Sequence, residues 1–185
     1  MWLLATHPLL ALAGLFGLDG LGLPLLPEVA ALLVFGLHPM ASWGVAMLAV
    51  IAAAETVAAA LLCLVVRATG LPPRLQRFMA AYAGMLVGRD ERLLLVNRFV
   101  PVLPAAGAFI HAANWRPGRS LAFIALGSVV KYGLLLGGSA LAFRWLPSRD
   151  ATFASLGAAA VFITVSGLLA LRRRLAQREE PAASA

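Results

Sequence analysis

Three stretches of this chain are each long and apolar enough to cross a lipid bilayer. They cover residues 40–66, 120–146 and 151–171, and a spanning helix needs about 20 predominantly apolar residues. Of the 185 residues, 62% are apolar and 12% are charged, whereas soluble domains carry about 45–50% and about 25%. This composition excludes a disordered chain, a secreted disulfide scaffold and an ordinary soluble enzyme, and it leaves an integral membrane protein.

Two further apolar regions, residues 9–37 and 93–113, are interrupted and do not form simple spans. In lipid, a broken backbone persists only where protein or a water-filled cavity satisfies its freed polar groups. We therefore predict two re-entrant helical hairpins, each entering the membrane and returning to the same side. For the first region, a tilted span over residues 2–18 is the alternative. The hairpin-breaking residues are Pro24, Pro27, Pro101 and Pro104.

The arginines are distributed unevenly over this topology. With two hairpins and three spans, eleven of them lie on one face, against Arg144 and Arg149 on the other. By the positive-inside rule, we expect this face and the C-terminus to be cytoplasmic. The protein is then a multi-pass protein of the cell membrane, that is, the inner or plasma membrane. The net charge of +7 is explained in this way, and because no basic face exists outside the short loops, nucleic acid is not an expected partner.

The two interrupted regions begin an internal repeat. The tetrapeptides at residues 24–27 and 101–104 both read Pro-x-Leu-Pro, and each is followed by a proline-bearing turn and a long span with one ionisable residue at a matching depth. We predict an all-α integral membrane protein with one domain over residues 1–171. Its repeat halves, about 9–66 and 93–146, are inverted in the membrane as in secondary transporters.

The last span follows the repeat, and residues 172–185 are expected to form a basic and then, from residue 177, a disordered cytoplasmic tail. Residues 71–89 are either an amphipathic helix along the headgroups or an ordinary loop helix. Residues 1–8 lack the positive charge of a signal peptide, so we expect them in the mature protein.

Four ionisable side chains fall at membrane depth in this arrangement: Glu28, Glu55, Arg98 and Lys131. Insertion scales put each charge near 2.5–3.5 kcal/mol, so four unpaired charges would cost roughly 10–14 kcal/mol, as much as a whole domain's stability. They must be neutralised, paired or in contact with water. Two acids and two bases allow complete pairing, and we expect the hairpin tips to bring Glu28 and Arg98 towards each other.

These charges are either ion pairs that fix helix positions or a transport site. Buried pairs are often no better for stability than apolar packing, and a carboxyl group in a low dielectric favours its neutral form, which suits a proton carrier. The planar guanidinium of arginine matches phosphate. We predict phosphate binding at Arg98 and Lys131, with Asn97 serving either the anion or freed backbone carbonyls. Glu28 and Glu55 are the predicted proton-coupling residues.

Other polar residues carry weaker signals. Asp19 is expected at the outer rim of the first hairpin, and His111 and Asn114 either gate or cap the second. Gly133 and Gly137 form a close-packing motif that serves packing within one chain or a homodimer. The sequence contains no metal-ligand spacing, Gly-rich phosphate loop or Ser/His pair, so we expect no metal, no cofactor and no enzyme activity.

Two motifs resemble a known family. Asn97-Arg-Phe-Val-Pro-Val-Leu-Pro-Ala-Ala-Gly-Ala-Phe109, followed by Trp115 and a span, resembles the second-hairpin signature of the DedA family, also called the VTT or SNARE-associated domain. Pro27-Glu28 followed by Gly36-Leu37-His38-Pro39 is similar to its first-hairpin pattern. The resemblance covers roughly residues 20–145. It implies two re-entrant hairpins and proton-motive-force-linked translocation of a lipid phosphate, either polyprenyl phosphate or phospholipid, with Glu28 and Arg98 in transport.

The chain also departs from that family. Relatives often carry a second arginine where this chain has Pro104, and their second acid is typically an aspartate closer to a Gly-Arg pair than Glu55 is to Arg67. Lys131 is unusual for the family and is a candidate to replace the missing positive charge. We therefore expect a divergent transporter or flippase of an anionic lipid or lipid-linked phosphate. A small-ion or small-solute exporter and a non-transporting membrane scaffold are the alternatives.

Overall fold

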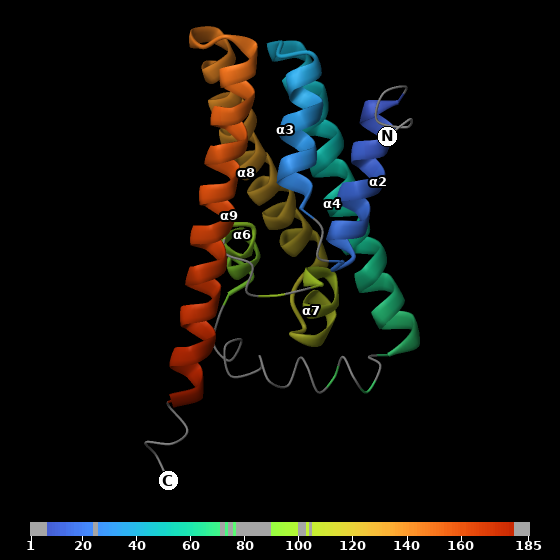
Figure 1. The fold of residues 1–185 in the computed structure, drawn as a ribbon. Coiled ribbons are helices and arrows are strands. Elements are labelled where there is room, and N and C mark those ends of the chain that lie inside the picture. The colour runs from blue at the N-terminus through green and yellow to red at the C-terminus, as the bar shows by residue number, and fades with distance from the viewer. Residues whose placement is uncertain are drawn as a thin grey trace.

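Every element in the described part of the chain is an α-helix (Figure 1). The computed structural model describes residues 7–23, 26–70, 73, 76, 90–99, 103 and 105–179. Three of the four predicted hairpin-breaking prolines, Pro24, Pro101 and Pro104, lie outside these residues. So does most of the predicted headgroup helix over 71–89, of which only Pro73 and Gln76 are described, both as helix.

Three long apolar helices form the frame of the molecule: α4 (Ala41–Thr69), α8 (Pro117–Trp145) and α9 (Ser148–Glu179). Each contains a stretch long and apolar enough to cross a membrane, which in α9 covers Ser148–Leu169. In Figure 1, α4 and α9 run in one direction and α8 runs back between them. The three predicted segments are therefore helices of the required length and apolarity, and their alternation places Arg67, Arg119 and Arg172 at one end of the molecule and Arg144 and Arg149 at the other.

The outer faces of these helices are apolar. Side chains exposed there include Leu61, Leu64, Leu134, Leu141, Val161 and Leu168. Water-soluble monomers rarely expose apolar patches larger than a few hundred square ångströms. The length of the helices and their apolar exteriors together indicate a membrane-associated protein.

Helix α9 is longer than predicted. It continues to Glu179, so residues 177–179, which we expected to be disordered, belong to the helix. The sequence Arg-Arg-Arg-Leu-Ala-Gln-Arg after residue 171 explains the difference, since these residues are strong helix formers and cations near a helix C-terminus are favoured by its dipole. Residues beyond 179 lie outside the described part.

The first interrupted region forms two short antiparallel helices, α2 (Pro8–Gly20) and α3 (Pro27–Leu37). Their 13 and 11 residues correspond to about 20 and about 17 Å, which is less than a bilayer core. Gly22 lies between them at φ +96°, a conformation that favours glycine. Figure 1 shows the chain descending through α2 and returning through α3 to the same end.

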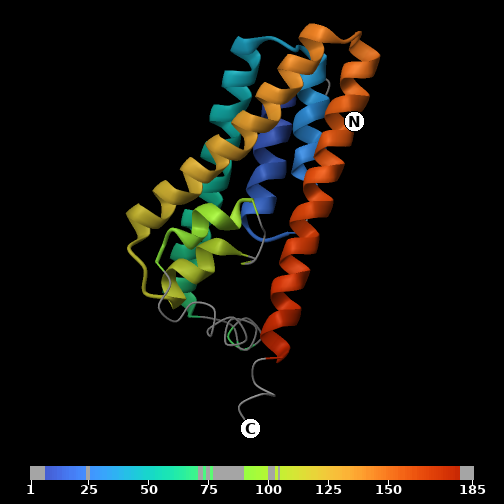
Figure 2. The same cartoon turned by 90° about the vertical axis from the view of Figure 1, so that its left-hand side faces the viewer.

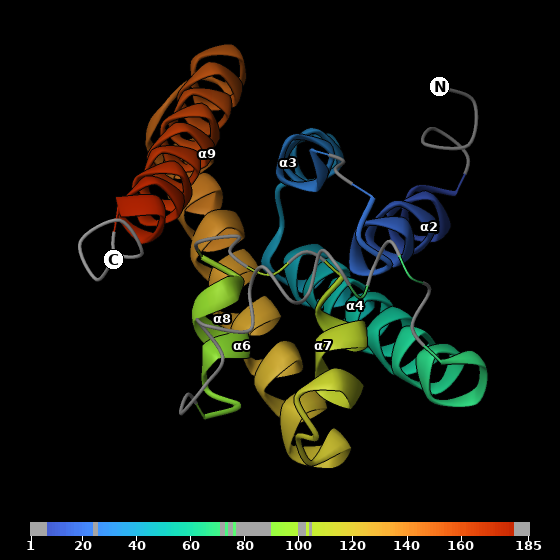
Figure 3. The same cartoon turned by 90° about the horizontal axis from the view of Figure 1, so that it is seen from below.

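The second interrupted region forms the shorter helices α6 (Leu93–Asn97) and α7 (Ala106–Ala112). Figures 1 and 2 place them nearer the opposite end of the frame from α2 and α3. Seen from below in Figure 3, α7 lies between α4 and α8, α6 lies beside α8, and α3 lies between α2 and α9. Both predicted hairpin regions are therefore helical pairs packed against long helices.

Glycines allow both short helical pairs to pack closely on α4. A Cβ atom on Gly20 of α2 would lie 2.8 Å from the Cβ of Ala58, and one on Gly107 of α7 would collide with the carbonyl oxygen of Ala59. Small residues let helix backbones approach in this way. Because Ala58 and Ala59 are neighbours, the inner ends of both pairs meet near the middle of α4.

The apolar core divides into two clusters, one on each side of this meeting point. One is formed mainly by α2, α3, α4 and α8, with Phe16, Phe35, Met47 and Tyr132 as its largest members. The other joins α4, α7 and α8 around Phe109, Ile110 and Ile124. Glu28, Glu55, Arg98 and Lys131 lie between the two clusters.

Candidate functional site

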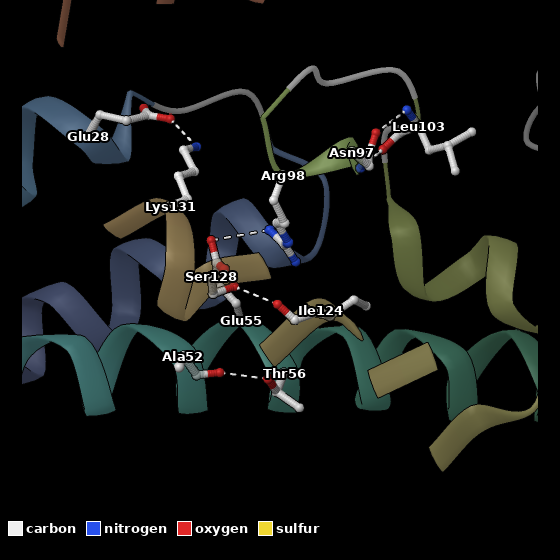
Figure 4. A network of polar contacts seen from close by, with 10 residues as sticks. All are labelled: Glu28, Ala52, Glu55, Thr56, Asn97, Arg98, Leu103, Ile124, Ser128 and Lys131. Atoms are coloured by element: carbon white, nitrogen blue, oxygen red, sulfur yellow. Dashed lines mark hydrogen bonds and ion pairs between the residues drawn. The ribbon is translucent and has the colours of Figure 1, made fainter. Parts of the chain in front are cut away.

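The four predicted charges come from four different elements and face one another (Figure 4). Glu28 lies in the first turn of α3, directly after Pro27, which begins the helix. Glu55 is in the middle of α4, Arg98 immediately follows α6, and Lys131 is in the middle of α8. Residues that lie between 27 and 103 positions apart in the sequence are thus brought together by the packing of the two hairpin regions.

The first ion pair joins α3 to α8. Nζ of Lys131 lies 2.5 Å from Oε1 of Glu28, and the two side chains are 12% and 11% exposed. The same ammonium lies 4.9 Å from the ring centre of Tyr132 and 5.7 Å from that of Phe162. Aromatic faces attract cations at these distances, so Lys131 is held on several sides at the edge of a cavity.

The second ion pair joins the end of α6 to α4. Nη1 of Arg98 lies 3.2 Å from Oε1 of Glu55, whose side chain is only 1% exposed. The hydroxyl of Ser128 donates to the other carboxylate oxygen of Glu55. Gly127 makes room for the Arg98 side chain, since a Cβ there would lie 2.8 Å from Cγ of Arg98. Both oxygens of Glu55 are therefore occupied.

The prediction that two acids and two bases pair completely is confirmed, but the partners differ from those expected. Glu28 pairs with Lys131, and Arg98 pairs with Glu55 rather than with Glu28. Helix α6 packs on α8 beside Gly127, and this position directs Arg98 across α8 to α4. Glu28 and Arg98 are not paired with each other as we expected, but both line the same cavity.

Asn97 serves the backbone of its own hairpin region. Its Nδ2 donates to the carbonyl oxygen of Leu103 at 3.0 Å, and its Oδ1 accepts from the Leu103 N–H at 2.6 Å. This amide satisfies the freed backbone between α6 and α7, which is one of the two roles considered for it. Asn97 also lines the central cavity beside Arg98.

The central cavity has a volume of about 360 Å³ and lies between both hairpin regions, α8 and α9. Its charged and polar lining residues are Asp19, Glu28, Asn97, Arg98, Lys131 and Ser166. A second cavity of about 220 Å³ shares Glu28, Phe99, Lys131 and Phe162 with it and is otherwise apolar, lined by Leu134, Leu135 and Ala158. The two cavities therefore place a charged region next to an apolar one.

Asp19 is the residue of this site that sequence reasoning misplaced. We expected it at the outer rim of the first hairpin, but it ends α2 at the central cavity. The sequence could have indicated this position, because Asp19 lies beside the turn of a predicted re-entrant hairpin, and the turn is the part of such a hairpin that reaches deepest. Two residues of α8 were also missed as parts of the site, Ser128 and the fully buried Tyr132.

A separate polar cluster lies at the arginine-rich end. The buried carboxylate of Glu91 accepts the backbone N–H of Arg116 at 2.8 Å and lies 3.2 Å from Nε of Arg119. A carboxylate at this position suits the N-terminus of α8, and it fixes the start of α6 to the start of α8. Asn114, at φ +53°, donates its N–H to the His111 carbonyl, which agrees with a capping role.

Within the described residues, no group of three or more His, Cys, Asp and Glu side chains is arranged to hold a metal ion. Comparison with models of known protein families gave no match, and neither did comparisons with curated proteins or with solved structures. The resemblance to the DedA family stays a prediction from short motifs. The function is therefore argued from the cavity itself.

Proposed function

We propose that this protein is a transporter or flippase that moves an anionic lipid or lipid-linked phosphate across the cell membrane and couples the movement to protons. The observation that carries the proposal is the central cavity, in which Arg98 and Lys131 sit beside an apolar extension. A phosphate group needs cationic donors, and a lipid chain needs an apolar wall. The two adjoining cavities together offer the cationic donors and the apolar wall.

Two features favour an anion at the cations. Arginine and lysine make strong charge-assisted hydrogen bonds to phosphate, and Nε of Arg98 is buried without a hydrogen-bond partner among the described residues. A buried donor without a partner is costly. An oxygen of a bound phosphate would satisfy it, and Lys131, on the same cavity wall, would supply the second positive charge.

Proton coupling follows from competition for the cations. Each cation is held by a carboxylate, Lys131 by Glu28 and Arg98 by Glu55, so an incoming phosphate must displace one or both. A displaced carboxylate in apolar surroundings is strongly disfavoured as an anion and is neutralised by a proton. Anion binding and proton uptake are then linked through these two glutamates.

The architecture favours transport over a fixed scaffold. The inner ends of α2–α3 and α6–α7 reach adjacent residues of α4, Ala58 and Ala59, from opposite ends of the frame. Broken helices in inverted repeats that meet at a central charged site are typical of secondary transporters. We interpret the two pairs as re-entrant hairpins of a divergent DedA-like protein, with the arginine-rich end and C-terminus in the cytoplasm. Gly137 has open space beside it, so a helix of a second copy could pack there. We therefore keep the homodimer as a proposal.

The test is movement of fluorescent phospholipid and of polyprenyl phosphate across proteoliposomes, with and without an inward proton gradient. We expect wild-type protein to move at least one of these lipids faster with the gradient. Arg98→Gln and Glu28→Gln should abolish the movement while the purified proteins keep wild-type size-exclusion profiles and helix content.

The rival functions give different results in the same assay. If no lipid moves but a small anion crosses and Glu28→Gln blocks it, the protein is a small-ion exporter. If neither crosses under any gradient and Arg98→Gln only impairs folding, the charges have a structural role and the transport proposal is wrong.

A further inference from the structure

We propose that Asp19 is the residue of the cavity that binds the incoming proton, and that its protonation admits the anion. This inference rests on the proposed function and refines it, because it assigns to Asp19 the coupled proton that the proposed function assigned to Glu28 and Glu55. The argument comes from the position of Asp19, from the pairing of its neighbours and from the charge count of the cavity.

Asp19 occupies a central position that is still open to the cavity. It precedes Gly20, where an added Cβ would lie 3.3 Å from the backbone oxygen of Glu55, and it lines the same cavity as Arg98 and Lys131. Its side chain is half-buried. The carboxylate of Asp19 is therefore accessible from the cavity, whereas Glu55 is almost completely enclosed.

Five charged or titratable groups interact electrostatically with Asp19: Glu28 of α3, Glu55 of α4, Arg98 after α6, and Lys131 and Tyr132 of α8. Of these, Glu28, Arg98 and Lys131 line the same cavity. Among the described residues, no ion pair or side-chain hydrogen bond involves Asp19. Each glutamate has its own cation, so Asp19 is the carboxylate that lacks one.

The charge count makes Asp19 the favoured site for a proton. Three carboxylates face two cations, so the group carries a formal charge of −1 when all are ionised. A proton on either glutamate would free a cation at membrane depth. A proton on Asp19 leaves both ion pairs intact and the whole group neutral, and neutrality is what a low-dielectric interior favours.

The charge count of the cavity also links binding of the proton to binding of the anion. With Asp19 ionised, an incoming phosphate meets a site with excess negative charge. When water in the cavity delivers a proton to a carboxylate oxygen of Asp19, that repulsion is removed, and the phosphate can compete for Lys131 and Arg98. Release of the proton restores the negative charge and favours departure of the anion.

The experiment compares the pH profile of lipid movement in proteoliposomes for wild type and Asp19→Asn. One obligatory proton makes the wild-type rate fall by up to about tenfold per pH unit on the alkaline side. Asp19→Asn mimics the protonated state, so its rate should stay flat over that range and should not respond to a proton gradient. Asp19→Glu should keep the pH dependence, and Asp150→Asn, an exposed position at the far end of the frame, should match wild type.

Infrared spectroscopy of the purified proteins supplies a readout that does not depend on transport. Titration should show a carboxyl C=O band in wild type that is absent from Asp19→Asn. If wild type moves lipid and Asp19→Asn keeps the wild-type pH profile, the inference is overturned while the proposed function stands. If wild type moves no lipid, the proposed function fails, and the infrared band alone decides: its loss in Asp19→Asn supports Asp19 as the proton site, and its persistence overturns that assignment.

Discussion

The two ion pairs of the central site have the same chemistry but differ in their surroundings. In the first pair, the carboxylate of Glu55 is 1% exposed and its second oxygen is bound by Ser128, while the side chain of Arg98 is 11% exposed and lines the central cavity. Glu28 and Lys131 form a pair whose side chains are 11% and 12% exposed and which borders both the charged and the apolar cavity. The first pair fixes α6 to α4 and presents only its arginine to the space that a ligand would enter, whereas both members of the second pair face that space.

This difference assigns unequal tasks to the pairs. An ion pair without water resists separation, because each charge would be left unpaired in a low dielectric. A pair at the edge of a cavity separates more easily, because water or a ligand replaces the lost partner. We therefore expect Lys131 to exchange Glu28 for an anion first, while Arg98 holds the hairpin region in place and contributes its unused Nε.

The largest effect should come from breaking the pair formed by Glu55 and Arg98. Glu55→Leu leaves Arg98 without its counter-ion, and the loss of one partner of a buried pair costs about 3–5 kcal/mol. Thermal unfolding of the purified protein, followed by helix content in detergent, measures the loss. The double variant Glu55→Leu/Arg98→Leu should recover most of the lost stability. Equal melting of wild type and Glu55→Leu would show that the pair is not enclosed.

A smaller stability effect and a larger functional one are expected at the pair formed by Glu28 and Lys131. Lys131→Met removes one ion pair at the edge of the cavity, for which we expect a loss of about 1.5–3 kcal/mol, together with loss of lipid movement. Unfolding and proteoliposome assays on the same preparation measure both. If Lys131→Met transports normally while Glu55→Leu remains the less stable variant, Lys131 has no part in anion binding.

The smallest effect should come from Ser128. Ser128→Ala removes the hydroxyl that binds Glu55 and should lower stability by about 1 kcal/mol without abolishing transport, because the ion pair itself remains. Ser139→Ala, which removes a hydroxyl bonded to Ser155 between α8 and α9, is a matched control away from the site. Full loss of transport in Ser128→Ala alone would indicate that this hydroxyl contacts the substrate.

The spans were predictable because hydropathy over about 20 residues depends on composition rather than on tertiary contacts. The frame α4, α8 and α9 therefore lies close to its predicted positions, whereas the end of α9 was missed because helix formation by an arginine-rich segment depends on propensity and not on hydropathy. It was also predictable that the four charges within the apolar segments are compensated, because unpaired charges there are costly.

The partners of those charges were not predictable from the sequence. Whether Glu28 meets Arg98 or Lys131 depends on the side of α8 on which α6 packs, and that side is set by the space at Gly127 and not by any motif. Asp19 was misplaced because an aspartate beside a glycine is typical of an ordinary exposed turn. Its position becomes clear only when Gly20 is found packed against the middle of α4.

Binding of a polyprenyl monophosphate to the purified protein in weakly buffered solution, with proton uptake recorded during the titration, tests the central claim most directly. We predict saturable binding accompanied by net proton uptake, with binding lost in Lys131→Met and in Arg98→Gln. Binding without proton uptake, or binding that both variants retain, would contradict the claim that the phosphate binds at Lys131 and Arg98 and that a proton is taken up with it.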